Sequence, residues 1–287
     1  MGHQKIIDNV KEQARRLGIE SVLFTFEPHP KTVIQKSRFA NIELLTTIDE
    51  KIEVLEQTGL GSLVISEFTK SFAAISAEEF VREMLVEKLK MKSIIVGHDH
   101  AFGRDREGSD ELLFKLGQEL GFQVQIVEQI SNENDRISST AIRQALRQGH
   151  VELAKRMLGR PYSLSGAVVH GEKQGKKLGF PTANIQPDSK YKLIPKPGIY
   201  ATTVRIRGDV HESVTYIGVK PTFDGAHKVV EVHVHDFDDS LYDETITVYF
   251  FKFLREDRKF NSTDELAEMI KKDKYNATTF FANGGTL

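Results

Sequence analysis

The sequence contains no cysteine and no tryptophan, and only 8 of its 287 residues are proline. Without cysteine the chain forms no disulfide and offers no thiolate to a metal, which excludes the disulfide-rich secreted class and cysteine-ligated zinc proteins. Long apolar runs are also missing. None reaches the length of a membrane span, and residues 1–5 lead into an amphipathic segment instead of the apolar core of a signal peptide. These absences predict a cytoplasmic protein that does not enter a membrane.

The chain has no excess of charge of either sign. Its 39 Lys and Arg residues face 41 Asp and Glu residues, which gives a formal net charge of -2. No overall positive field is present to attract nucleic acid, and the sequence shows no stripe of interleaved aromatic and basic residues. Because any phosphate binding must then be local, we expect small-molecule partners and no nucleic acid. Self-association is left open by the sequence.

The first half of the chain alternates helical and strand-like segments. Residues 3–17 carry apolar side chains at helical spacing, and Gly18 then ends the helix. Short apolar runs separated by helical segments follow at residues 21–26, 62–65, 93–96 and 122–127. This alternation predicts an α/β domain with a mostly parallel, Rossmann-like sheet. A helix at the start of such a sheet implies a preceding central strand, whose removal would expose apolar edges of the neighbouring strands.

The second half has the alternation of an antiparallel β domain. Gly159-Arg160-Pro161 breaks a helical stretch over residues 139–158. Alternating runs follow at residues 199–206, 214–219, 229–237 and 245–253. A final helix is expected over residues 263–279, capped by Ser262 or Thr263. We therefore predict two domains, residues 1–158 and residues 159–287.

Residues 166–184 contain the groups that a phosphate site needs. Glycine lets backbone N–H groups approach phosphate oxygens, lysine supplies charge, and hydroxyl and amide oxygens are ligands for Mg²⁺. The residues concerned are Gly171, Gly175, Lys176, Gly179, Thr182 and Asn184. Their spacing is not that of a Walker A loop. From glycine and lysine alone, a mobile surface hairpin is the favoured interpretation.

Glu231 is a candidate general base. Period-two alternation places Glu231, His233 and His235 on one face of a strand and three valines on the other. A carboxylate on a rigid strand suits a general base, whereas the solvated face of an edge strand is the alternative. Two histidines without a third ligand make a weak case for zinc, so we interpret both histidines as structural.

Further candidate residues lie where strands end and helices begin, the position at which ligands gather in α/β sheets. In the first half these positions are Gly2-His3, residues 26–30 and residues 97–103. A later helix start places hydroxyls and free N–H groups beside an arginine one turn inside, at Ser138, Ser139, Thr140 and Arg143. A triphosphate binds such a helix start, or the hydroxyls only cap the helix.

Gly179-Phe180-Pro181-Thr182-Ala183-Asn184 resembles the signature of riboflavin kinases, and the likeness extends in order and spacing over residues 160–280. The resemblance implies a small antiparallel β-barrel that transfers phosphate from Mg-ATP to riboflavin. It implies that Thr182 and Asn184 hold Mg²⁺ and the ATP phosphates. By the same resemblance, Glu231 accepts the proton of the ribityl 5′-hydroxyl and Arg255 belongs to the flavin site.

Residues 137–143 resemble the Ile-Ser-Ser-Thr-x-x-Arg motif of the FMN adenylyltransferase module of bacterial bifunctional FAD synthetases, and residues 2–158 match that module. The resemblance implies a nucleotidyltransferase fold in which FMN attacks the α-phosphate of ATP, pyrophosphate leaves and FAD forms. It implies catalytic roles for His3 and Arg143. Implied nucleotide contacts are Gly2, Ser138, Ser139 and Thr140, and implied flavin contacts are Phe26, Pro28, His29, Asp99 and Phe102.

One departure from that family stands at the start of the chain. The family has Phe-Asp-Gly-x-His-x-Gly-His after a strand, whereas this sequence begins Met1-Gly2-His3. The resemblance therefore predicts a member that is N-terminally incomplete and lacks the first strand and the first histidine of the motif.

Three functions remain open from the sequence. The first is an enzyme of flavin synthesis that combines riboflavin kinase with FMN adenylyltransferase, and the second is a kinase only. The third is a non-catalytic regulator that binds flavin or nucleotide. Because Thr182, Asn184 and Glu231 are all present, the sequence favours an enzyme.

Overall fold

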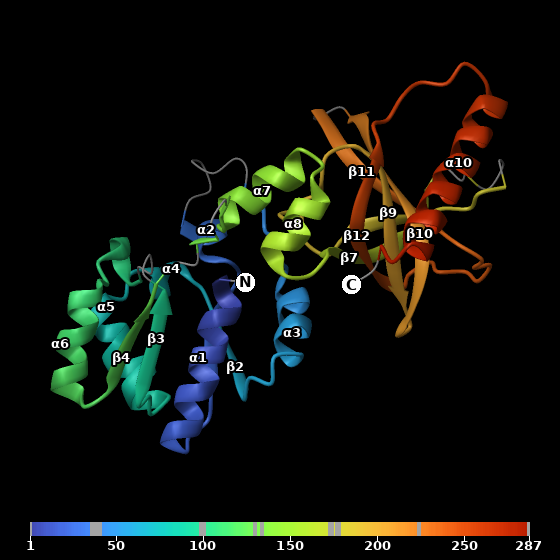
Figure 1. Ribbon diagram of the computed structural model, residues 1–287. Helices are drawn as coiled ribbons and strands as arrows, with labels where there is room; N and C mark the ends of the chain where they lie inside the picture. The colour runs from blue at the N-terminus through green and yellow to red at the C-terminus, as the bar shows by residue number, and fades with distance from the viewer. Residues whose placement is uncertain are drawn as a thin grey trace. The chain divides into compact units, whose positions relative to one another are not determined.

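The chain divides into two compact units in a computed structural model (Figure 1). The structure describes residues 2–34, 42–97, 102–128, 131–132, 135–171, 175, 179–222 and 225–285. Unit 1 comprises Met1–Ile42 and Lys51–Ile137, and unit 2 comprises Glu43–Glu50 and Ser138–Leu287. The boundaries of these units differ from those of the predicted domains, residues 1–158 and 159–287. The predicted division into domains therefore stays a prediction.

Unit 1 alternates strands with helical segments, as the sequence predicts. Its helical segments are α1 (Gly2–Leu17), α2 (Pro30–Ile34), most of α3 (Ile48–Glu56), α4 (Lys70–Ala73), α5 (Ala77–Glu79), a π-helix η1 (Phe80–Lys88), a short 3-10 helix η2 (Arg104–Arg106) and α6 (Asp110–Leu120). Its strands are β1 (Val22–Glu27), β2 (Ser62–Glu67), β3 (Ser93–Gly97), β4 (Gln123–Val127), β5 (Ser131–Asn132) and β6 (Asp135–Arg136).

The predicted parallel pairing of unit 1 is confirmed. β1 pairs with β2, with Val22 opposite Ser62, and β3 pairs with β4, with Ser93 opposite Gln123. The four strands form two separate pairs and not one sheet, because no strand among the described residues pairs with the second edge of β1 or of β3.

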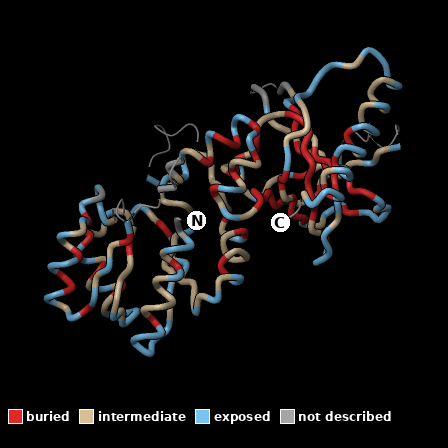
Figure 2. Tube along the Cα trace, in the orientation of Figure 1, coloured by how far each residue is buried: buried red, intermediate tan, exposed pale blue. Residues whose placement is uncertain are grey.

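Unit 2 is built on a closed antiparallel barrel, and the predicted β-rich architecture is confirmed. Its strands are β7 (Tyr162–Val169), β8 (Ala183–Pro187), β9 (Gly198–Ile206), β10 (Asp209–Thr222), β11 (Gly225–Val234) and β12 (Thr245–Arg255). They follow one another around the barrel in the order β10-β11-β8-β7-β12-β9. Buried residues are concentrated in this barrel (Figure 2).

Three helices accompany the barrel: α7 (Ser139–Arg147), α8 (Val151–Leu158) and α10 (Thr263–Ala282). The helical stretch expected over residues 139–158 consists of the two helices α7 and α8, because Gly149 takes a left-handed φ of 83° just after α7 ends. Helix α10 packs its Ala277 and Phe281 against the barrel. Its predicted cap is confirmed, since the Ser262 hydroxyl accepts a hydrogen bond from Glu265 N at 3.1 Å.

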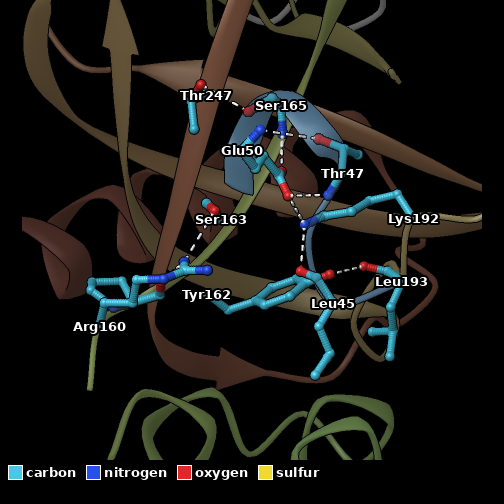
Figure 3. A network of polar contacts seen from close by, with 11 residues as sticks. Leu45, Thr47, Glu50, Arg160, Tyr162, Ser163, Ser165, Lys192, Leu193 and Thr247 are labelled. Carbon is cyan, nitrogen blue, oxygen red and sulfur yellow. Dashed lines mark hydrogen bonds and ion pairs between the residues drawn. The ribbon is translucent and has the colours of Figure 1, made fainter. Parts of the chain in front are cut away.

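The segment Glu43–Glu50 is held in unit 2 by backbone and buried polar contacts. Leu44 N donates to Tyr191 O at 2.7 Å, and Leu193 N donates to Leu44 O at 3.0 Å. Lys192, which stands between Tyr191 and Leu193 in the sequence, forms an ion pair with Glu50. The Lys192 side chain is 0% exposed and the Glu50 side chain is 2% exposed. The pair is thus fully enclosed (Figure 3).

Further hydrogen bonds satisfy both members of this ion pair. The Glu50 carboxylate accepts from Ser165 N at 3.1 Å and from Thr47 N at 3.0 Å. The Lys192 ammonium donates to Leu45 O at 2.8 Å and lies 4.5 Å from the centre of the Tyr162 ring. Buried charges are tolerated only when they are paired and hydrogen-bonded in this way.

None of the helices among the described residues combines the length and the apolarity that crossing a membrane requires.

Candidate functional site

The structure brings Thr182, Asn184 and Glu231 together on two neighbouring strands of the barrel. Asn184 on β8 lies directly opposite Glu231 on β11. The Thr182 hydroxyl donates to Glu231 Oε2 at 3.1 Å. The valines that alternate with Glu231 are buried, whereas the Glu231 side chain is 23% exposed. A hydroxyl, an amide and a carboxylate therefore meet on the outer face of the barrel, where a ligand can reach them.

Two residues that the sequence analysis did not single out adjoin Glu231. Lys220 Nζ lies 4.0 Å from Glu231 Oε1. Tyr216 lies opposite Glu231 on β10, and its hydroxyl donates to Asp257 Oδ2 at 2.9 Å. Burial, followed by the hydrogen bond to Asp257, raises the pKa of Tyr216, so the hydroxyl remains protonated. Lys220 and Tyr216 lie beside Glu231 because of the register in which β10 pairs with β11, and no local sequence pattern predicts that register.

The glycines of the predicted phosphate loop have steric reasons to be glycine. A Cβ on Gly171 would collide with the side-chain amide of Asn184, and one on Gly175 would collide with the carbonyl of Phe180. Gly179 has a left-handed φ of 82°. The backbone of residues 171 and 175 thus lies close against the Phe180–Asn184 motif. Lys176, also predicted for this loop, lies outside the described residues.

His233 holds the turn that precedes Thr182. Its Nδ1 lies 2.9 Å from the carbonyl oxygen of Pro181. Because a carbonyl only accepts, Nδ1 carries the proton. The Phe180 ring meets the His233 ring edge-on at 5.6 Å between centroids. Burial lowers the pKa of His233, which favours the neutral ring.

His235 gives the fold a dependence on pH. It is 7% exposed, and burial, aided by the charge of Lys274, lowers its pKa to about 4. The other groups near its ring are His233, Asp236, Glu212 and Thr278. In the unfolded chain the pKa is ~6.5. Between pH 6.5 and 4 the unfolded state therefore binds a proton that the folded state does not, and stability is lost as the pH falls.

We expect the melting temperature to fall by several degrees between pH 7 and pH 5, and to fall less in His235→Gln. Calorimetry at a series of pH values measures this difference. The matched control is His150→Gln, which changes an exposed histidine. Identical pH profiles for wild type and His235→Gln would contradict the assignment.

Arg255, the predicted flavin contact in the second half of the chain, forms hydrogen bonds with helix α10. Its guanidinium donates through Nε to Asp273 Oδ1 at 2.9 Å and through Nη2 to Asp273 Oδ2 at 2.6 Å. Asp273 is 3% exposed. This two-pronged pair fixes the end of β12 to α10. The predicted role of Arg255 toward flavin stays a prediction.

At the start of α7 the structure shows capping. The Ser138 hydroxyl accepts from Ala141 N at 3.2 Å, while Ser139 and Thr140 are exposed. Arg143 Nε donates to Glu43 O at 2.7 Å, and burial lowers the pKa of Arg143. All four residues belong to unit 2. Their predicted role toward a triphosphate stays a prediction.

Three of the five predicted flavin residues of unit 1 border a cavity of about 1100 Å³. Phe26, His29 and Phe102 line it, and the Phe26 ring contacts Phe72 at 5.1 Å between centroids. Pro28 is exposed just after β1. Gly2 and His3 lie in the first turn of α1, but the side chain of His3 is outside the described part of the structure. Asp99 lies outside the described residues altogether.

The donor set on the barrel suits a magnesium ion bound to phosphate. Thr182, Asn184 and Glu231 present oxygen atoms, which Mg²⁺ prefers, and Mg²⁺ is usually held by one or two protein groups together with substrate phosphates. Across the described part of the chain, His, Cys, Asp and Glu side chains do not gather in groups of three that could hold a metal by themselves.

Two family models match the chain in the order of its parts. The FAD synthetase model matches residues 1–141, and the riboflavin kinase model matches residues 158–281. The chain is therefore an enzyme of flavin cofactor synthesis.

Curated relatives combine both activities in one protein. The bifunctional riboflavin kinase/FMN adenylyltransferase of Bacillus subtilis is 35% identical over 99% of this chain and 89% of its own length. The protein of the same name from Escherichia coli K12 is 35% identical over 98% of this chain and 88% of its own length. The chain belongs to the bifunctional riboflavin kinase/FMN adenylyltransferase family, and the resemblance on which the sequence analysis rests is confirmed.

A solved structure shares the fold over nearly the whole chain. It is described as a macrolide-efflux protein from Streptococcus pneumoniae, with a TM-score of 0.86 and 31% identity over 96% of this chain and 89% of that one. A parallel-strand unit followed along the chain by an antiparallel barrel is thus present in an experimental structure.

Proposed function

We propose that this chain phosphorylates riboflavin to FMN with Mg-ATP and then adenylylates FMN to FAD. The observation that carries the kinase assignment is the meeting of Thr182, Asn184 and Glu231 on the outer face of the barrel. The two family models support both activities, and a kinase alone is not favoured, because the FAD synthetase model matches the first half.

In the kinase step Glu231 accepts the proton of the ribityl 5′-hydroxyl. The oxygen takes the γ-phosphoryl group of ATP, and ADP leaves. The Thr182 hydroxyl, which donates to Glu231, keeps that carboxylate oriented. Thr182 and Asn184 would hold Mg²⁺, which neutralises charge on the phosphates. Phosphoryl transfer depends mainly on such positioning and charge neutralisation.

In the adenylyltransferase step the FMN phosphate attacks the α-phosphorus of ATP and pyrophosphate leaves. The family model over residues 1–141 supports this assignment. For the flavin, the aromatic and imidazole side chains of Phe26, His29 and Phe102 at the unit 1 cavity are suitable contacts. The nucleotide contacts Gly2, Ser138, Ser139 and Thr140 and the catalytic roles of His3 and Arg143, which the sequence resemblance implies, stay predictions. The absence of nucleic-acid binding and a cytoplasmic location stay predictions.

Two incubations of the purified chain test the proposal. In one, riboflavin, ATP and Mg²⁺ are supplied, and in the other FMN replaces riboflavin. Chromatography resolves the flavins. We expect FMN in the first mixture and FAD in the second. Binding of flavin and ATP without any product in either mixture would favour the non-catalytic regulator instead.

His233 is expected to act as a positioning residue for the Thr182 turn. His233→Leu removes the donor to Pro181 O, so Thr182 is no longer fixed beside Glu231. We expect the KM for Mg-ATP to rise about 10-fold, equivalent to ~1.4 kcal/mol of binding. The expected fall in kcat is smaller. His233→Asn, which keeps a short amide donor, is expected to restore most of the affinity.

Steady-state kinetics with Mg-ATP as the varied substrate measure this effect. The matched control is His211→Leu, because that ring packs on Phe237 instead of the motif. If His233→Leu and His211→Leu change KM equally, or if His233→Asn is as impaired as His233→Leu, the histidine has only a structural role.

A further inference from the structure

Strand register places three polar side chains in one row across the outer face of the barrel. Asn184 on β8 lies opposite Glu231 on β11, and Glu231 lies opposite Tyr216 on β10. Residues directly opposite each other in an antiparallel pair share one face of the sheet and lie ~5 Å apart. The next member of the row is Ile199 on β9, which is 6% exposed and belongs to an apolar cluster with residues of α10. The open part of the row therefore consists of Asn184, Glu231 and Tyr216.

The order of the row determines on which side of Glu231 the phosphate acceptor lies. The proposed function assigns Mg²⁺ and the ATP phosphates to Thr182 and Asn184, on one side of the base. In phosphoryl transfer the attacking and leaving oxygens lie roughly in line on opposite sides of the phosphorus. Because Glu231 holds the attacking 5′-hydroxyl, the rest of the acceptor extends away from Asn184. In the row that direction leads to Tyr216.

Tyr216 presents an oriented oxygen at this position. A Cβ on Gly218 would collide with the hydroxyl and the ring of Tyr216, so the glycine lets the ring lie against the backbone of β10. The Tyr216 hydroxyl donates to Asp257 Oδ2 at 2.9 Å, in the segment that follows β12. A phenolic oxygen that donates its proton still accepts a hydrogen bond through its lone pairs. The row thus holds a fixed hydrogen-bond acceptor next to the base.

We infer that Tyr216 is a specificity-determining residue of the kinase site, whose hydroxyl accepts a hydrogen bond from a secondary hydroxyl of the ribityl chain. The inference rests on the proposed kinase function and adds to it the group that recognises the polyol. An alkyl chain in the same place offers no donor and would leave the Tyr216 oxygen covered without a partner, which is unfavourable. The site therefore selects a polyol chain over an alkyl chain.

Asp257 is assigned a positioning role in this recognition. Its carboxylate takes the phenolic proton and thereby directs the lone pairs of the Tyr216 oxygen. Without that acceptor the hydroxyl group is free to turn, and its oxygen no longer faces the substrate in one fixed orientation. Removing Asp257 should therefore weaken recognition less than removing the Tyr216 hydroxyl itself.

Two competitive inhibitors of riboflavin phosphorylation test the inference with the full chain. The first, 5′-deoxyriboflavin, keeps the secondary hydroxyls and lacks the reacting one. The second has the same isoalloxazine with a plain pentyl chain in place of the ribityl chain, so it lacks every hydroxyl. Both lack the hydroxyl that is phosphorylated. Because inhibition is measured as a loss of FMN formation from riboflavin, the inhibition constants report binding at the kinase site alone.

We expect Tyr216→Phe to raise the inhibition constant of 5′-deoxyriboflavin about 10-fold, the usual effect of one lost hydrogen bond, and to leave that of the pentyl compound unchanged. Asp257→Ala is expected to show a smaller loss, again confined to 5′-deoxyriboflavin. The matched control is Tyr275→Phe, which removes a phenolic hydroxyl from a 70% exposed residue of α10 and should change neither constant.

Equal weakening of both inhibitors in Tyr216→Phe would show that the residue only shapes the site, and no change in either would show that the ribityl chain lies elsewhere. Each of these results overturns the inference while the wild-type chain still converts riboflavin to FMN, so the kinase assignment stands. If the wild-type chain forms no FMN from riboflavin, the proposed kinase function fails and the inference fails with it.

Discussion

Glu231→Gln is expected to lower the kcat for FMN formation by about 10²- to 10⁴-fold, the usual contribution of a general base. Glutamine keeps the shape of glutamate and leaves an oxygen to accept from the Thr182 hydroxyl, but it does not take up a proton. Because Thr182, Asn184 and the loop at Gly171 are unchanged, Mg-ATP still binds. The expected signature is therefore a loss of kcat with little change in affinity for Mg-ATP.

Rapid-quench assays of FMN formation and equilibrium titration of Mg-ATP measure the two quantities separately. The matched control is Glu268→Gln on α10, where a 73% exposed carboxylate is replaced. Unchanged turnover in Glu231→Gln would remove this residue from the mechanism. A parallel loss of Mg-ATP binding would instead assign Glu231 to the nucleotide site.

Lys192→Met is expected to destabilise unit 2 by about 3–5 kcal/mol, the cost of leaving one charge of a buried ion pair without its partner. The Glu50 carboxylate is 2% exposed, so water does not replace the lost ammonium. Its hydrogen bonds from Ser165 N and Thr47 N remain, but they do not supply the missing charge (Figure 3). Denaturant unfolding measures the change.

A double-mutant cycle separates the lost ion pair from lost packing. Lys192→Met combined with Glu50→Gln removes both charges and keeps an amide oxygen as a hydrogen-bond acceptor near Ser165 N and Thr47 N, so we expect the double variant to recover much of the lost stability. Lys196→Met is the matched control, because its partner Glu256 is 72% exposed and surface pairs contribute only about 0–1 kcal/mol. Equal destabilisation by Lys192→Met and Lys196→Met would show that enclosure of the pair has no energetic consequence.

The elements that apolar patterning defines were predictable from sequence. The four runs at residues 21–26, 62–65, 93–96 and 122–127 correspond to β1 to β4, because short apolar runs between helices signal buried strands. One of the helical segments expected between these apolar runs contains the π-helix η1 (Phe80–Lys88). A shift from i+4 to i+5 hydrogen bonds does not alter apolar spacing enough to be recognised in advance.

The candidate site was predictable in its chemistry but not in its register. Thr182 and Asn184 stand in a recognisable motif, and Glu231 stands on an alternating strand. Nothing local indicates that Asn184 lies opposite Glu231, because pairing register depends on the closure of the whole barrel. The Lys192–Glu50 pair was missed for the same reason: its members lie 142 residues apart and share no motif.

The enclosure of Glu50 by the barrel unit also has a consequence for chimeric genes. In a hybrid that takes residues 1–158 from one relative and residues 159–287 from another, Glu50 comes from the first parent and Lys192 from the second. Wherever two parents differ in this pair, such a single-crossover hybrid inherits one buried charge without its partner. A viable exchange must therefore move the short segment Glu43–Glu50 together with the barrel, which requires two additional crossovers.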